Sequence, residues 1–158
     1  MANYYTQFST VLDVGGRADE AMAVVDRMRA ELDADPENGA VSEAAFDCIT
    51  ILAQDDKIWL HSDENGSAED AAAIILAIGK ELGLKGAHSF EWANTASRPL
   101  LDAFGGGAVR VDFDAQSFSL AGSSWIMEAM AHPEFEETIR ALIDEVNAAK
   151  EKSASPSP

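Results

Sequence analysis

The alternation of strand-like and helix-like hydrophobic patterns over residues 4–93 is the feature that most constrains this fold. Half-buried strands place apolar side chains at every second position, and amphipathic helices place them at every third or fourth. Four segments are typical of strands, namely residues 4–14, 46–53, 57–62 and 87–93. Two segments are typical of helices, namely residues 18–32 and 71–82. The predicted order is therefore strand, helix, strand, strand, helix, strand.

This order predicts an α+β protein with a ferredoxin-like split βαβ core, in which two helices cover one face of an antiparallel sheet. Residues 108–113 and 117–121 are expected to add a β-hairpin, and C-terminal helices are expected to follow, up to about residue 150. We expect a single α+β domain over residues 1–152. The proline- and serine-rich residues 153–158 are expected to form a disordered tail.

Negative charge dominates the composition, with 28 acidic and 11 basic residues giving a net charge of −17. Residues 36–70 alone carry nine acids and one base. Such an excess repels nucleic acid and anionic membranes, so we expect neither to bind directly. A solvated acidic surface that maintains solubility is one interpretation. The other is an acidic face that imitates a nucleic-acid backbone and binds a basic protein partner. Candidate residues for this face are Asp55, Asp56, Asp63, Glu64, Glu69 and Asp70.

The sequence lacks the features that direct a chain into or across a membrane. It contains no run of about 18 apolar residues, and its first residues form neither a basic region nor an apolar signal core. We therefore expect a cytoplasmic protein.

The segment from Phe90 to Val111 concentrates aromatic, polar and glycine residues between two predicted strands. Small polar side chains after residue 93, together with Pro99, favour a loop there. One interpretation is that the loop and the exposed amides of its glycines surround an anionic or polar ligand. The other is an irregular connection in which the glycines form a bulge or a tight corner. The candidate site residues are Trp92, Asn94, Thr95, Ser97, Arg98, Gly105, Gly106 and Gly107.

No catalytic pattern is recognisable. The three histidines lie outside any nucleophile-elbow motif, and no ligand spacing typical of a metal site is present. His88 and Glu91 are three positions apart in a predicted strand, so they should point to opposite faces of the sheet. The sequence therefore predicts a protein that is not an enzyme and needs no cofactor or metal.

Three strings in the sequence carry a family resemblance. They are Tyr-Tyr-Thr-Gln-Phe-Ser at residues 4–9, Phe-Glu-Trp-Ala-Asn-Thr at 90–95 and Phe-Gly-Gly-Gly-Ala-Val at 104–109. Over residues 4–128 the chain resembles an uncharacterised family of small bacterial and phage or plasmid proteins. The resemblance implies a mobile-element setting and brings no known activity with it.

Two functional hypotheses follow. The first is a non-catalytic acidic protein that binds, and inhibits or regulates, a nucleic-acid-handling partner through nucleic-acid mimicry. The alternative is a small-ligand or peptide binding module that uses the region from Trp92 to Val109.

The amphipathic pattern after residue 134 is compatible with a monomer or with a homodimer.

Overall fold

A computed structural model of the chain describes residues 3–98, 105–122, 140–141, 143–145 and 147–148. Contacts divide the chain into one unit of residues 1–122 and a second of residues 123–158. The described residues of the second unit are helical, as predicted. The predicted domain boundary at residue 152 and the predicted tail lie outside the described residues. In the described part, no helix has the length and apolar character needed to cross a bilayer.

The first unit is built on one six-stranded antiparallel sheet. Its strands are β1 (Tyr4–Asp13), β2 (Thr50–Gln54), β3 (Lys57–Ser62), β4 (Ala87–Ala96), β5 (Gly105–Asp112) and β6 (Ser117–Gly122). They lie side by side in the order β2-β3-β1-β4-β5-β6. Phe8 in the central strand β1 is paired with Ser62 on one side and with Trp92 on the other. The α+β class, the antiparallel sheet and the added β5–β6 hairpin are therefore confirmed.

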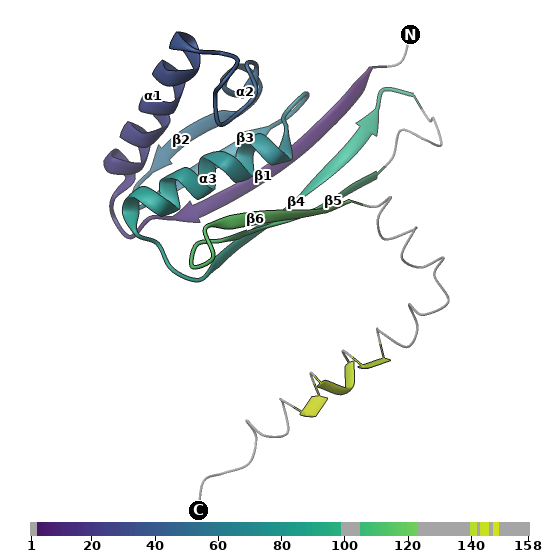
Figure 1. The fold of residues 1–158 in the computed structure, drawn as a ribbon. Coiled ribbons are helices and arrows are strands. Elements are labelled where there is room, and N and C mark those ends of the chain that lie inside the picture. The colour runs from purple at the N-terminus through teal and green to yellow at the C-terminus, as the bar shows by residue number, and fades with distance from the viewer. Residues whose placement is uncertain (1–2, 99–104, 123–139, 142, 146, 149–158) are drawn as a thin grey trace, which may run out of the picture. The chain divides into compact units, whose positions relative to one another are not determined.

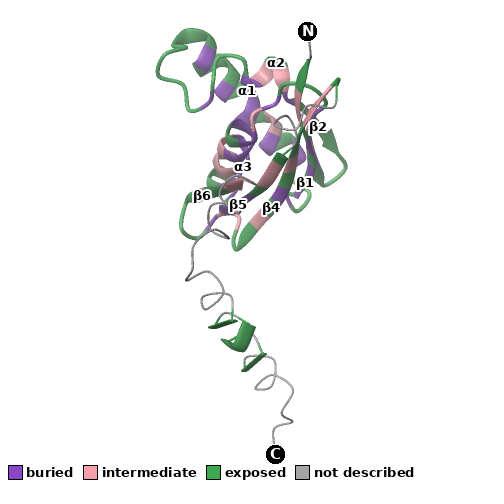
Figure 2. Cartoon of the chain, turned by 90° about the vertical axis from the view of Figure 1, so that its right-hand side faces the viewer, coloured by how far each residue is buried: buried purple, intermediate pink, exposed green. Residues whose placement is uncertain are grey.

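Two long helices, α1 (Ala18–Ala34) and α3 (Ala68–Leu82), contact each other on the same side of the sheet (Figure 1). Their apolar stripes explain this position, since buried residues recur along each helix at three- and four-residue intervals. Ile74, Ile75 and Ile78 of α3 are completely buried. Figure 2 shows that the buried residues gather where the helices face the strands.

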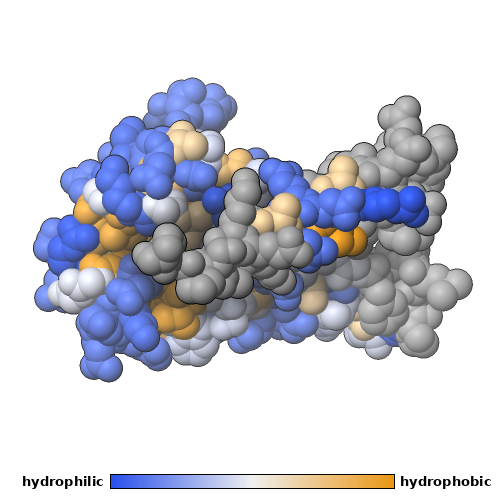
Figure 3. Space-filling model, turned by 90° about the horizontal axis from the view of Figure 1, so that it is seen from below, coloured by the Kyte–Doolittle hydropathy of each residue, from blue (hydrophilic) through white to orange (hydrophobic). Residues whose placement is uncertain are grey.

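The strands follow the expected alternation of buried and exposed residues. In β1, Phe8, Thr10 and Leu12 are buried, whereas the residues between them are exposed. Glu91 is exposed between Phe90 and Trp92, which are buried and half-buried. In the space-filling view, hydrophobic residues on this face of the molecule are flanked by hydrophilic residues (Figure 3). The core thus lies between one face of the sheet and the helices.

The ends of α3 follow the signals in the sequence. The hydroxyl of Ser67 accepts a hydrogen bond from the N–H of Asp70 at 3.1 Å, which is the predicted N-cap. At the other end, Gly83 adopts a left-handed conformation with φ of 63°, and its N–H donates to the carbonyls of Gly79 and Lys80.

The prediction of a strand over residues 46–53 was wrong for the first half of this segment. Residues Ala45–Cys48 form a single helical turn, α2, and strand β2 starts only at Thr50. An unbroken apolar run has no period, so it does not distinguish a strand from a buried helical turn. The aromatic ring of Phe46 in α2 lies beneath the guanidinium of Arg29, 5.1 Å from it.

Gly79 allows α3 to approach the sheet closely. A Cβ atom at this position would lie within 3.0 Å of the ring of Phe113, which follows β5 and is 4% exposed. The absence of a side chain at Gly79 therefore sets how closely α3 and this ring pack.

We expect Gly79→Ala to destabilise the first unit by about 1–2 kcal/mol, because overpacking outweighs the gain of about 1 kcal/mol in helix propensity. Urea unfolding monitored by circular dichroism would measure the change. In a Phe113→Leu background, where the ring is absent, the loss should be smaller. A Gly79→Ala protein as stable as the parent would show that the ring is free to move away.

A part-buried polar pair lies on the helix-covered face of the sheet. Nε2 of His88 in β4 and the hydroxyl of Thr10 in β1 are hydrogen-bonded at 2.7 Å. The ring of His88 also lies against Phe90, at 6.5 Å between centroids. Burial lowers the pKa of His88 below its ordinary value of 6.5, because the charged imidazolium loses its solvation.

His88 should make the folded state sensitive to acid. Above pH 6.5 the imidazole is neutral in both states, and as the pH falls below this value the unfolded chain binds the proton more readily. Stability should therefore be lost as the pH falls from 6.5 toward the lower folded-state pKa. Urea unfolding at about pH 7.5 and about pH 5.5 should show a larger acid-induced loss in the parent than in His88→Gln. If both proteins lost the same stability on acidification, a group other than His88 would be responsible for the acid sensitivity.

Candidate functional site

The glycine run predicted as part of a ligand loop belongs to strand β5. Gly105, Gly106 and Gly107 pair with Asn94, Ala93 and Trp92 of β4 in a continuous register. Both strands are therefore longer than predicted, since β4 continues to Ala96 and β5 begins at Gly105. The expected bulge does not occur in this ladder.

Close packing explains why these positions are glycines. A Cβ atom on Gly106 would lie within 3.0 Å of the carbonyl oxygen of Trp92, and Gly106 has a φ of 149°. A Cβ atom on Gly107 would overlap both the carbonyl oxygen of Ala121 and the indole of Trp92. The indole thus occupies the space above Gly107, and the glycines have a structural role.

The polar residues next to this ladder are mostly engaged with β1 and the residue before it. Thr6 donates from its hydroxyl to the side-chain carbonyl of Asn94 at 3.1 Å, and Thr95 is paired with Tyr5. Ser97 accepts a hydrogen bond from the N–H of Asn3 at 2.9 Å. Arg98 is exposed, and residues 99–104 lie outside the described residues. These contacts tie β4 to β1, while Asn94, Ser97 and Arg98 all remain exposed.

The six predicted acidic residues do not form one face. Asp55 and Asp56 lie in the turn before β3, whereas Asp63 and Glu64 follow its last residue. A six-residue strand is about 20 Å long, so these pairs stand at opposite ends of β3. Glu69 is exposed in the first turn of α3, the helix that follows Asp63 and Glu64 in the chain.

Asp70 is 7% exposed, and its carboxylate has internal partners. One carboxylate oxygen accepts a hydrogen bond from the N–H of Ser42 at 2.8 Å. The other accepts a hydrogen bond from the hydroxyl of Ser42 at 2.5 Å. Asp70 therefore fastens the loop after α1 to the first turn of α3, and it is not available to a partner.

The structure instead gathers acids from three segments, which we call the acidic end. The Ser42–Asp70 contact brings the loop after α1 to the start of α3, directly after the turn that follows β3. The acidic end consists of the exposed residues Glu31, Asp33, Asp35, Glu37, Glu43, Asp63, Glu64 and Glu69. Residues 31–47 and 63–79 contain no lysine or arginine. Among the described residues, no ion pair joins these eight acids to a lysine or arginine.

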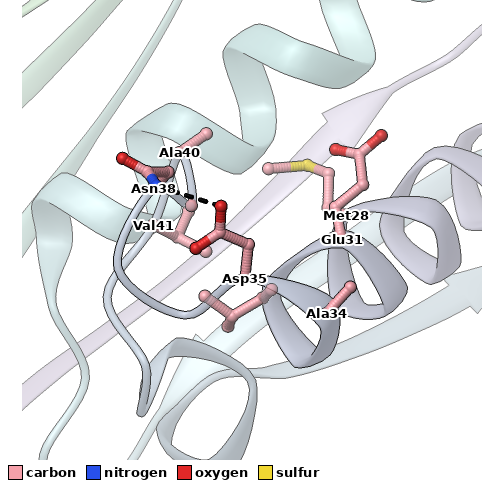
Figure 4. Close-up of a pocket in the computed structure, with 9 residues that line it drawn as sticks. Met28, Glu31, Ala34, Asp35, Asn38, Ala40 and Val41 are labelled. Carbon is pink, nitrogen blue, oxygen red and sulfur yellow. Dashed lines mark hydrogen bonds between the residues drawn. The ribbon is translucent and has the colours of Figure 1, made fainter.

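A pocket of about 390 Å³ lies at the acidic end, between the last turns of α1 and residues 38–41 (Figure 4). Met28 of α1 and Asp35 at its C-cap extend toward the loop that carries Asn38, Ala40 and Val41. The lining residues are Met28, Glu31, Leu32, Ala34, Asp35, Asn38, Gly39, Ala40 and Val41.

The arrangement favours binding of positive charge. Exposed carboxylates attract cations. In the described part of the chain, no group of three or more His, Cys, Asp or Glu side chains is placed to hold a metal ion. His61 is stacked on Trp59, with ring centroids 4.2 Å apart, on the face opposite the helices.

Sequence reasoning missed Glu31, Asp33, Asp35, Glu37 and Glu43 as members of a common surface. Their position depends on the fold of the loop after α1, which local patterns do not specify. The count of nine acids in residues 36–70 was the available signal, since it already included Glu37 and Glu43.

We expect Asp70→Ala to destabilise the protein by about 1–3 kcal/mol, because the part-buried donors of Ser42 lose their acceptor. Glu69→Ala is the matched control, since the adjacent side chain is exposed and should change stability by less than about 0.5 kcal/mol. Urea unfolding of both variants checks this difference. Equal effects would contradict the structural role of Asp70.

Comparisons of the chain with protein-family models, curated proteins and solved structures found no match.

Proposed function

We propose that this chain is a non-catalytic acidic protein that binds a basic protein partner. The observation that carries the proposal is the acidic end, whose eight exposed acids lie in segments that the Ser42–Asp70 contact brings together. Residues 31–47 and 63–79, which supply these acids, contain no lysine or arginine. Such a surface attracts a positively charged partner and accelerates its association.

The position of these acids supports a role in binding over simple solubility. Glu31 and Asp33 lie in the last turn of α1, which contains no basic residue. Negative side chains at a helix C-terminus are unfavourable, because the helix dipole is already negative there. A requirement for solubility alone is met equally well by acids placed elsewhere, so a bound cationic surface is the simpler explanation of this arrangement.

The class of partner follows from charge and from the family resemblance. Proteins that handle nucleic acid carry basic grooves that bind phosphates. An array of carboxylates competes for the same groove, and the resemblance to phage and plasmid proteins fits an inhibitor or regulator of such a partner. In this proposal the acidic end imitates the phosphate backbone.

The proposed scaffold is a ferredoxin-like core formed by β1 to β4 with α1 and α3. The strand order β2-β3-β1-β4 and the contact between α1 and α3 support this assignment. In this view α2 and the β5–β6 hairpin are additions to the core.

A tagged protein should capture a basic partner from a lysate of the source organism at about 0.1 M salt and release it at about 1 M, where screening is much stronger. Neutralising Glu43, Glu64 and Glu69 to glutamine should weaken capture about tenfold, mainly through slower association. Quantitative pull-down followed by surface plasmon resonance would measure the loss.

The matched control neutralises three acids outside the acidic end, with Glu20→Gln, Asp55→Asn and Asp56→Asn. Asparagine suits position 55, where φ is 53°. Both triple variants change the net charge equally, so only a local surface distinguishes them. If both triple variants lose the same amount of partner capture, the effect is due to net charge and not to the acidic end. The absence of any salt-sensitive partner would overturn the proposal.

A further inference from the structure

The pocket at the acidic end combines an apolar wall with a charged mouth. Met28, Leu32 and Val41 supply apolar side chains, and all three belong to the buried core. Glu31, in the last turn of α1, and Asp35, at its C-cap, are both exposed and both line the pocket. Figure 4 shows the carboxylate of Glu31 beside Met28, and that of Asp35 facing the loop.

The two carboxylates have spare hydrogen-bonding capacity. Asn38 donates to Oδ2 of Asp35 at 2.9 Å, which leaves Oδ1 of Asp35 available. Within the described residues, no cation pairs with Glu31 or Asp35. Two like charges at the same pocket repel each other, so these two acids destabilise the unbound protein.

The end of α1 adds backbone acceptors to the same place. The N–H of Asp35 donates to the carbonyl of Glu31 at 3.0 Å. The next carbonyl, that of Leu32, would require the N–H of residue 36, but residue 36 is a proline and has none. The negative end of the helix dipole therefore adds to the field of the carboxylates.

From these observations we propose that the pocket receives a single lysine or arginine side chain of the partner. The aliphatic stem lies along Met28, Leu32 and Val41, and the charged head group meets Glu31, Asp35 and the end of α1. Long basic side chains have this dual character, with an apolar stem and a cationic tip. The inference rests on the proposed function, because it specifies how the acidic end would hold a basic protein.

Direct binding of a small probe tests the pocket without the partner. The probe is N-acetyl-lysine methylamide, titrated into the ¹⁵N-labelled full chain and followed by amide chemical shifts. The matched control is the same compound acetylated on Nε, which keeps the stem and removes the charge. We expect saturable shifts at residues 28–41 in the low millimolar range, at roughly 4 kcal/mol or less of binding free energy, and none with the control.

Three variants separate the pocket from general attraction between charges. Glu31→Gln with Asp35→Asn should weaken probe binding about tenfold, since two ionic contacts are lost. Asp33→Asn with Glu37→Gln removes the same charge from neighbouring residues that do not line the pocket, and should retain binding. Ala40→Phe should block the probe by filling the space while all carboxylates remain.

The proposed role of the pocket would be overturned by chemical shifts that do not saturate and are spread over the acidic residues. It would also be overturned if both double variants lost probe binding equally. Binding that survives Ala40→Phe would overturn it as well. These outcomes are distinct from failure of the proposed function, because a salt-sensitive partner would still be captured through the remaining acids. Conversely, a partner whose capture requires Glu31 and Asp35 but not Asp33 and Glu37 would support the inference.

Discussion

Burial of one face of the sheet beneath α1 and α3 is the interaction on which the rest of this structure depends. A net charge of −17 opposes any compact state through self-repulsion, so the stabilisation must come from apolar contact. Ile74, Ile75 and Ile78 are fully buried, and each such side chain contributes roughly 1.5–3 kcal/mol. Buried Thr10 is accommodated in this core because its hydroxyl is hydrogen-bonded to the part-buried His88.

The same architecture determines where charge can accumulate. Residues of the central strands are committed to pairing and to the core, so acids are concentrated in helix ends and connections. The antiparallel sheet places successive connections at opposite ends, and this separates Asp55 and Asp56 from Asp63 and Glu64. Asp70 then holds the loop after α1 at the start of α3, and a pocket lies between this loop and the end of α1.

Local patterns were sufficient to predict most of the fold, but only part of the candidate site. Strands β1 and β3 and both long helices have clear periodicity, and Ser67 and Gly83 mark the ends of α3. Glycine has no side chain, so the run at Gly105 to Gly107 has no period, and its place in β5 depends on Trp92 across the ladder. Likewise, the burial of Asp70 depends on Ser42, which is 28 residues away in the sequence. The pocket, which arises where a loop folds back on α1, has no sequence signature.

The central position of β1 constrains the order in which the molecule can be assembled. β1 leaves the ribosome before both of its partner strands, because its neighbours β3 and β4 end only at Ser62 and Ala96. Until about residue 96 has emerged, β1 has an unpaired edge and Phe8 lacks the ring of Phe90, 5.5 Å away in the folded state. Long-range pairing of this kind slows folding and prolongs the exposure of apolar strands. The nascent chain would therefore pass through an interval in which its N-terminal strand is available to chaperones or to another copy of itself.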